Sequence, residues 1–308
     1  MFELLRQHFS QYEVVLEPDR NEPEWWAGAP SVMRAPDGTF YLAARMRSPE
    51  MPPGQRGYEI RILKSADGVR FEPIHRITRE AASVPGFERP ALLLDPQTGQ
   101  FRLYACAALE HGWSILRFDD ADDPARFDPK SLRPVITPPA PHGLLIEPGF
   151  KDPVILWAEG QWHLYAIGLD RVERTWHFTS PDGERWTSDP RNPIFDNGGW
   201  HNFYTRPSCV LPMDIGYLFV YGGSNARWHD PNYNIGTGLA YSLDLTHVTD
   251  LTPDAPLLIS TTPGRTQIWR YSQWLRVADE LFVYAECARP NASNEIRRFR
   301  VPAACAAV

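Results

Sequence analysis

Hydrophobic positions along this chain alternate with polar ones over short segments, a pattern typical of β-strands rather than helices. One strand-like segment recurs five times: a turn residue, alternating apolar residues with a tyrosine among them, and a small residue. Helical periodicity is almost absent after the first ten residues. The pattern predicts an all-β fold built from an internal repeat. The copies span residues 38–44, 99–105, 160–166, 216–222 and 279–285.

Each copy follows another apolar strand, and in four copies a proline opens that strand: Pro30, Pro90, Pro153 and Pro207. Proline is tolerated at the first residue of a strand. A third and a fourth strand complete each unit, and residues 65–71 and 180–186 form related turns. We predict a single domain, residues 1–308, folded as a five-bladed β-propeller with four-stranded antiparallel blades. A β-sandwich is the alternative, but it does not explain the repeat.

The fifth unit contains only three strands before the chain ends. Residues 12–17 have a strand pattern and can supply the missing outer strand. We therefore expect this N-terminal strand to close the last blade from outside. Residues 1–11 are expected to form a short helix or extension.

The charge and composition of the chain limit the classes of molecule that it is expected to bind. The net charge is -7 and the arginines are dispersed, so we expect no nucleic-acid partner. No apolar segment approaches the roughly 18 residues that span a membrane. The N-terminus lacks the pattern of a signal peptide, so a cytoplasmic protein is expected. The four cysteines form no CxxC pair and are expected to be free thiols. The oligomeric state stays open.

The propeller prediction brings distant segments to one face. The first strand of a blade lines the channel, so segments entering it and segments leaving the second strand meet at the same mouth. Rings and charged groups gathered in this way suit a carbohydrate, and the many arginines favour an anionic one. The same segments also contain Arg47, Glu147, Lys151, Asp170 and Glu173. The predicted substrate-binding residues are Trp25, Trp26, Arg45, Arg89, His201, Tyr204, Arg206, Asn225, Arg270 and Tyr271.

Asp152 is singled out by its place in the repeat. The residue before the strand proline is Ala29, Arg89, Asp152 or Arg206, so Asp152 is the one acid at this position. Equivalent side chains in equivalent strands point the same way, so we expect Asp152 to lie near the axis, flanked by two arginines that keep it ionised. The alternative is an ion pair that merely ties two units together.

Residues 150–166, together with residues 87–90 and 99–104, resemble the blade signature of five-bladed glycosidases in glycoside hydrolase families 43, 32 and 130. The resemblance implies a glycoside hydrolase with a pair of acids at the base of the funnel. It implies Asp152 as base, nucleophile or orienting carboxylate. Glu88 would then be the general acid, kept protonated by the nearby Asp152.

The match to these families is partial. Family 43 places its base aspartate on the first blade, where this chain has Ala29, and its acid on the third blade rather than the second. The Glu-Asp-Pro-Arg string of family 130 is reduced to Glu88-Arg89-Pro90. The sequence therefore indicates a distant relative.

Glu286 is the rival catalytic acid. It lies two residues after Tyr284, at a repeat position filled elsewhere by Arg45 and by uncharged residues. An acid at such a position is an unusual core residue. The alternative role for Glu286 is an ion-pair partner of Arg45 or Arg270.

Other functions remain open at this stage. The group His201, Tyr204 and Arg206 also suits a polysaccharide lyase acting on a uronate-containing glycan. For His201 the preferred alternative is a satisfied surface or core histidine. Phosphorolysis and sugar binding without cleavage are further alternatives. No cofactor is required, although a channel lined by Asp and His can hold Ca²⁺.

Overall fold

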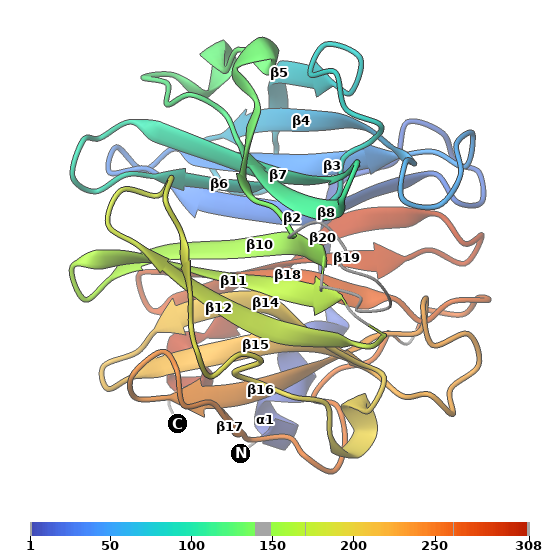
Figure 1. Ribbon diagram of the computed structural model, residues 1–308. Helices are drawn as coiled ribbons and strands as arrows, with labels where there is room; N and C mark the ends of the chain where they lie inside the picture. Colours follow the sequence, from blue (N-terminus) through green and yellow to red (C-terminus); the bar gives the residue numbers. More distant parts are fainter. Residues whose placement is uncertain (1, 139–148, 170, 261, 307–308) are drawn as a thin grey trace.

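The computed structural model describes residues 2–138, 149–169, 171–260 and 262–306, and strands dominate it (Figure 1). The chain begins with a short helix α1 (Phe2–Gln7) and a 3₁₀ turn (His8–Ser10), where a helix or extension was predicted. None of the described helices is long or apolar enough to cross a membrane. The four cysteines carry free thiols, as predicted.

Among the described strands, antiparallel pairing gives five groups of four strands, here called units, which coincide with the predicted repeats. Single parallel pairs link the third unit to the fourth and the fifth unit to the first, so the strands form two eight-stranded sheets and one four-stranded sheet. The first unit contains β2 (Trp26–Arg34), β3 (Phe40–Arg47), β4 (Gly57–Ser65) and β5 (Glu72–Thr78). The second contains β6 (Ala91–Leu94), β7 (Phe101–Leu109), β8 (Gly112–Arg117) and β9 (Arg133–Ile136). The third contains β10 (Gly149–Ala158), β11 (Gln161–Leu169), β12 (Glu173–Ser180) and β13 (Thr187–Ser188).

The fourth unit contains β14 (Tyr204–Pro212), β15 (Tyr217–Ser224), β16 (Gly236–Ser242) and β17 (Thr249–Asp250). The fifth contains β18 (Trp269–Val277), β19 (Glu280–Ala288), β20 (Asn294–Pro302) and the N-terminal β1 (Glu13–Leu16). Strand β1 pairs antiparallel with β20, with Glu13 opposite Arg298. The prediction that an N-terminal strand completes the last unit is confirmed.

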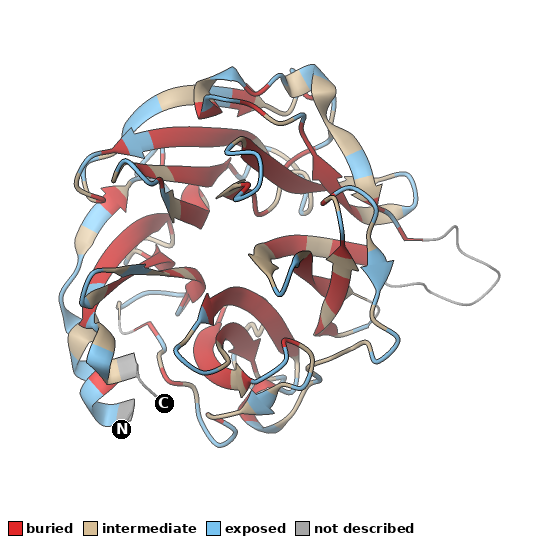
Figure 2. Cartoon of the chain, turned by 90° about the vertical axis from the view of Figure 1, so that its left-hand side faces the viewer, coloured by how far each residue is buried: buried red, intermediate tan, exposed pale blue. Residues whose placement is uncertain are grey.

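The first strands of the units lie innermost and contact one another in the order β2, β6, β10, β14, β18 and again β2. Figure 2 shows the units arranged around a common centre, with buried residues on their inner strands. Five apolar clusters each join two neighbouring units, including one between the first and the fifth. Burial of apolar surface between units, rather than within one sheet, therefore holds the fold together.

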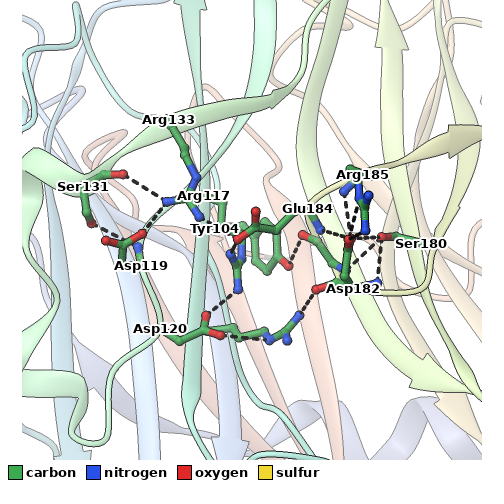
Figure 3. Close-up of polar contacts among 12 residues, drawn as sticks. Tyr104, Arg117, Asp119, Asp120, Ser131, Arg133, Ser180, Asp182, Glu184 and Arg185 are labelled. Atoms are coloured by element: carbon green, nitrogen blue, oxygen red, sulfur yellow. Dashed lines mark hydrogen bonds and ion pairs between the residues drawn. The ribbon is translucent and has the colours of Figure 1, made fainter.

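Neighbouring units also dock through a repeated turn. The turn at Ser180–Gly183 of the third unit accepts a hydrogen bond from Tyr104 Oη of the second unit at 2.8 Å (Figure 3). Tyr284 donates in the same way to the Gly68 carbonyl at 2.8 Å, and Tyr165 to the Leu245 carbonyl at 2.8 Å. Three tyrosines of the recurrent strand therefore bind the turn of the following unit, or, for Tyr284, of the first unit.

The strand prolines differ from the prediction that each opens its strand. Pro30, Pro153 and Pro207 lie inside β2, β10 and β14, which begin three or four residues earlier. The strand register shifts at Pro30 and Pro153 and directly after Pro207, so these prolines lie in or beside β-bulges, where a missing N–H disturbs the strand pairing least. Only Pro90 directly precedes its strand.

Candidate functional site

A polar cavity of about 380 Å³ opens where the inner strands of several units begin. This is the face that the repeat predicted. Six of the predicted residues line it, and eight further residues complete its wall. The predicted six are Arg45, Glu88, Tyr204, Arg206, Arg270 and Tyr271. The further eight are Arg47, Pro53, Gly54, Trp113, Lys151, Glu173, Asn232 and Tyr233.

Two larger grooves lie elsewhere on the molecule, and their walls are mainly apolar. One is bounded by residues such as Leu211, Ile215 and Arg276, and the other by Phe9, Trp269 and Phe299. Neither brings a pair of acids together with several cations as the polar cavity does. The predicted cleavage of a glycosidic bond needs a pair of acids. We therefore place the candidate site in the polar cavity.

Asp152 lies in the bulge of β10 with a φ of 57°, in the left-handed region that few residues other than glycine adopt. The bulge re-aims its carboxylate. Its oxygens accept hydrogen bonds from the Arg89 backbone N–H at 3.1 Å and from Tyr271 Oη at 2.9 Å. Tyr271 has a similar φ of 53° in the equivalent bulge of β18. Two strained bulges therefore bring Asp152 and Tyr271 together.

The charge of Asp152 is set by its neighbours. Burial alone would raise its pKa, because a buried carboxylate loses its water. Lys151, Arg206 and Arg45, with the Tyr271 hydrogen bond, outweigh burial and hold the pKa of Asp152 below its usual value. The prediction of an ionised Asp152 agrees with this direction.

Asp152 was expected to be kept ionised by Arg89 and Arg206, but the structure gives Arg89 another role. Arg89 contacts Asp152 only through its backbone N–H, while its guanidinium donates to the carbonyls of Pro207 and Ser208 at 3.2 and 2.5 Å. Among the described residues, Asp152 forms no ion pair with Arg89 or Arg206. Asp152 is 1% exposed and lies behind Tyr271, which lines the cavity.

Glu88 lines the cavity from the segment before β6, and its side chain is 15% exposed. Its carboxylate pairs with Arg45 of the first unit. Asp152 was expected to keep Glu88 protonated. Among the described residues, no hydrogen bond joins the two carboxyl groups.

Glu173, at the start of β12, is the second carboxylate in the cavity wall. It pairs with Lys151 Nζ at 2.7 Å and with the Arg206 guanidinium. Burial opposes its charge, but Arg206 and Lys151 outweigh burial, so the pKa of Glu173 lies below its usual value. Glu173 is therefore a charged group held between two cations.

Glu286 is fully buried below the cavity and does not line it. Its oxygens accept from Arg270 at 2.8 and 3.1 Å, Asn294 at 2.6 Å, the Ala29 N–H at 2.9 Å and Arg45 at 3.4 Å. Gly28 leaves room for it, since a Cβ there would lie 2.0 Å from its Oε2. Arg270 and Arg45 outweigh burial and hold the pKa of Glu286 below its usual value. The proposed partnership with both arginines is therefore present.

The other predicted residues divide into supports and distant residues. Trp26 lies beneath the cavity, with the guanidinium carbons of Arg47 and Arg270 at 3.8 and 5.0 Å from its ring centroid. Trp25 packs against Tyr58 and does not line the cavity. Asn225 stabilises its own turn through the Arg227 N–H.

His201 is buried and does not line the cavity. Its two ring nitrogens contact Thr205 Oγ1 at 2.8 Å and Asp250 Oδ2 at 3.1 Å. This is the environment of a satisfied structural histidine. The predicted group of His201, Tyr204 and Arg206 is therefore not brought together at the cavity.

Strand alternation alone did not single out Arg47, Lys151 or Glu173, although all three lie in the segments predicted to form this face. A usable signal existed for Arg47, which is two residues after Arg45 and so shares its side of β3. Asn232 and Tyr233 lie within residues 223–235, which were also predicted to form this face, but neither was singled out, and nothing in the sequence marked Trp113. Glu147 and Asp170 lie outside the described residues. Within the described part of the chain, no cluster of three acids, histidines or cysteines suits a metal, and Ca²⁺ binding stays untested.

No family model and no curated protein matches this sequence. Solved structures do match over nearly the whole chain. A protein described as a glycoside hydrolase aligns with a TM-score of 0.75 and 14% identity, covering 94% of this chain and 90% of that one. A protein solved as an RGII complex aligns with a TM-score of 0.73 and 13% identity, covering 97% and 95%.

The β-1,2-mannobiose phosphorylase from Listeria innocua, solved as a β-1,2-mannobiose complex, aligns with a TM-score of 0.66 and 15% identity, covering 94% and 95%. The fold is thus distantly similar to that of propeller glycosidases and phosphorylases. The resemblance predicted from the repeat is confirmed at the level of the fold.

Proposed function

We propose that this protein is a glycoside hydrolase that binds a small glycoside or oligosaccharide in the polar cavity. The observation that carries the proposal is the cavity wall itself. It combines two carboxylates, Glu88 and Glu173, with the aromatic rings of Trp113, Tyr204 and Tyr271. Glycosidic cleavage uses a pair of carboxyl groups, and aromatic rings give sugars an apolar surface.

The site depends on a fold that we infer to be a closed five-bladed propeller. The cyclic contacts of the five inner strands support closure, as does the apolar cluster between the first and fifth units. A closed ring would explain why residues from all five units meet at one mouth.

Glu88 is proposed as the proton donor to the leaving oxygen. Of the two carboxylates in the wall it is the more exposed, with 15% of its side chain accessible against 3% for Glu173. In the described ranges Glu88 pairs with one cation, Arg45, whereas Glu173 is held between two. A proton donor must reach the scissile bond, and Glu88 has the freer side chain.

Asp152 is proposed as the second carboxylate and the base: it begins the reaction charged and takes up the proton of the attacking water through the Tyr271 hydroxyl, while Glu88 gives its proton to the leaving oxygen. Asp152 is linked to the cavity by Tyr271. The Tyr271 hydroxyl donates a hydrogen bond to Asp152 at 2.9 Å, and Tyr271 itself lines the cavity wall. Glu173 is the rival for this role because it lies in the wall itself.

The test compares Glu88→Gln, Asp152→Asn and Glu173→Gln on a panel of aryl glycosides, with Glu159→Gln as a control at a surface turn. Loss of an acid or base is expected to lower kcat by about 10²–10⁴-fold, since proton transfer contributes on that scale. Tyr271→Phe should reduce kcat with little change in KM if Asp152 acts through the hydroxyl. Wild-type turnover in Asp152→Asn would refute the role of Asp152. If only Glu173→Gln is inactive, the role passes to Glu173.

Phosphorolysis is the second candidate. Among the described residues, five cations line the cavity against two acids, and a phosphorylase is among the proteins of similar fold. The rate should then depend on inorganic phosphate and yield a sugar phosphate. A lyase is less well supported, because His201 lies away from the cavity. Ultraviolet absorbance of an unsaturated product would reveal a lyase, and binding without turnover would indicate a sugar-binding protein.

A further inference from the structure

Arg47 is an arginine buried at the edge of the cavity. It ends β3, is 7% exposed and lines the cavity wall. Its guanidinium carbon lies 3.8 Å from the centroid of the Trp26 ring, so one face of the guanidinium is covered by indole. A guanidinium held against a ring keeps its N–H groups in a fixed plane.

The other cations of the cavity wall all have carboxylate partners. Lys151 and Arg206 pair with Glu173, Arg270 pairs with Glu286, and Arg45 pairs with Glu88 and Glu286.

Arg47 differs from them. Within the described part of the chain it forms no ion pair, and its one hydrogen bond is a long one of 3.4 Å to Tyr233 Oη. Its Nε has no partner among the described residues.

The surroundings make an unpaired charge at this position unfavourable. Burial, followed by the neighbouring Arg45 and Arg270, lowers the pKa of Arg47 to about 10. A buried charge is usually paired, because removing it from water is costly. The described part of the protein supplies no anion for Arg47. An anionic ligand in the cavity would therefore supply the ion-pair partner that Arg47 lacks.

The groups beside Arg47 are hydrogen-bond donors. Tyr233 contacts the guanidinium, and the adjacent Asn232 also lines the cavity. The amide oxygen of Asn232 accepts a hydrogen bond from Tyr204 Oη, which leaves its N–H groups as donors. A planar guanidinium with neighbouring donors matches a planar carboxylate, which accepts two parallel hydrogen bonds.

We propose that Arg47 binds the carboxylate of an acidic sugar, so that the substrate is a uronic acid glycoside or an oligosaccharide containing one. The inference rests on the proposed function, whose sugar it specifies. Free inorganic phosphate offers similar oxyanion chemistry and is the competing source of the anion.

The experiment measures binding to the full chain by calorimetry, without requiring cleavage. The probes are D-glucuronate and D-galacturonate, each with its neutral counterpart, D-glucose or D-galactose. Arg47→Gln removes the charge and Arg47→Lys keeps it without the planar fork. Arg56→Gln is the matched control, because Arg56 pairs with Glu24 and does not line the cavity.

The wild-type protein is expected to bind a uronate about 10-fold or more tightly than the neutral sugar, as charge-assisted hydrogen bonds permit. Arg47→Gln should abolish this preference, because uronate affinity should fall about 10-fold more than neutral-sugar affinity, a difference that a misfolded variant would not show. Arg47→Lys should retain part of it, and Arg56→Gln all of it.

Equal binding of uronate and neutral sugar to the wild-type protein would overturn the inference. So would a titration in which Arg47→Gln loses inorganic phosphate binding but keeps its uronate preference, because Arg47 would then serve phosphate. Cleavage of neutral glycosides with no preference for uronic acid glycosides would refute the role of Arg47 in uronate binding but not the proposed hydrolase function. Uronate binding that depends on Arg47, with no cleavage of any glycoside, would refute only the proposed hydrolase.

Discussion

At the scale of single residues, the main feature is a set of acids that are charged although buried. Asp152, Glu173 and Glu286 are each buried, and the pKa of each lies below its usual value. In each case nearby cations outweigh the penalty of burial. These acids therefore contribute to stability as well as to the chemistry of the site.

Glu286 provides the clearest test of this contribution, because it does not line the cavity. Its folded pKa is lowered from an ordinary value of 4.5, so its stabilising effect is present above about pH 4.5 and is lost as pH falls through the folded pKa. Glu286→Gln should lower the free energy of unfolding at pH 7 by about 3–5 kcal/mol, since Arg270 loses its partner. The difference from the wild type should shrink below pH 4.5.

Denaturant unfolding between pH 3 and pH 7 measures both quantities. Glu110→Gln, at an exposed turn after β7, is the control and should leave stability unchanged. A Glu286→Gln variant as stable as the wild type at pH 7 would show that the buried network is not stabilising.

At the scale of elements, the turns that link the units matter as much as the strands. Tyr104 accounts for one such link, and Gly183, whose carbonyl accepts the bond from Tyr104, has a φ of 76°. A Cβ on Gly183 would lie 2.2 Å from Arg102 Nη1 and 2.7 Å from Tyr104 Oη. Glycine is therefore needed here both for its backbone conformation and for close approach.

Gly183→Ala should destabilise the protein by about 2–4 kcal/mol, because backbone strain and the clash with the second unit add together. The matched control is Gly160→Ala, where φ is 80° but no atom lies within 4 Å of the added Cβ. Gly160→Ala carries the strain alone, about 1 kcal/mol. Equal losses for the two variants in denaturant unfolding would mean that docking of this turn contributes nothing.

At the scale of the whole molecule, the two ends of the chain meet in the fifth unit. Strand β1 covers the edge of β20, and the preceding helix buries Leu5 in the cluster between the fourth and fifth units. Phe9 packs against Trp269 and Phe299 with ring centroids 5.6 and 5.5 Å apart. The N-terminal segment therefore protects an edge that would otherwise be free to pair with another chain.

Deleting residues 2–16 should lower the free energy of unfolding by about 3–6 kcal/mol, from the lost burial of Leu5 and Val15 and the exposed edge. Hydrogen exchange should then accelerate in β20 before it does in β4. Glu13→Gln is the control that removes only the ion pair with Arg298, and it should cost less than about 1 kcal/mol. An unchanged thermal unfolding temperature after the deletion would contradict this role of the segment.

The sequence by itself determined the units of this protein and the face on which its polar residues gather. A period-two pattern repeated five times fixes which residues become strands, because side-chain alternation and turn chemistry are local properties. The N-terminal strand was predictable for the same reason: the last repeat lacked one.

Only the tertiary structure decided which of those polar residues share one cavity. Alternation gives the side of a strand but not the bulges that turn Asp152 and Tyr271 toward each other, nor the partner that each charge finds. Glu88 meets Arg45, His201 meets Asp250, and Arg47 lies on Trp26 without an acid among the described residues. Such pairings depend on distances between units far apart in the chain, which local pattern does not encode.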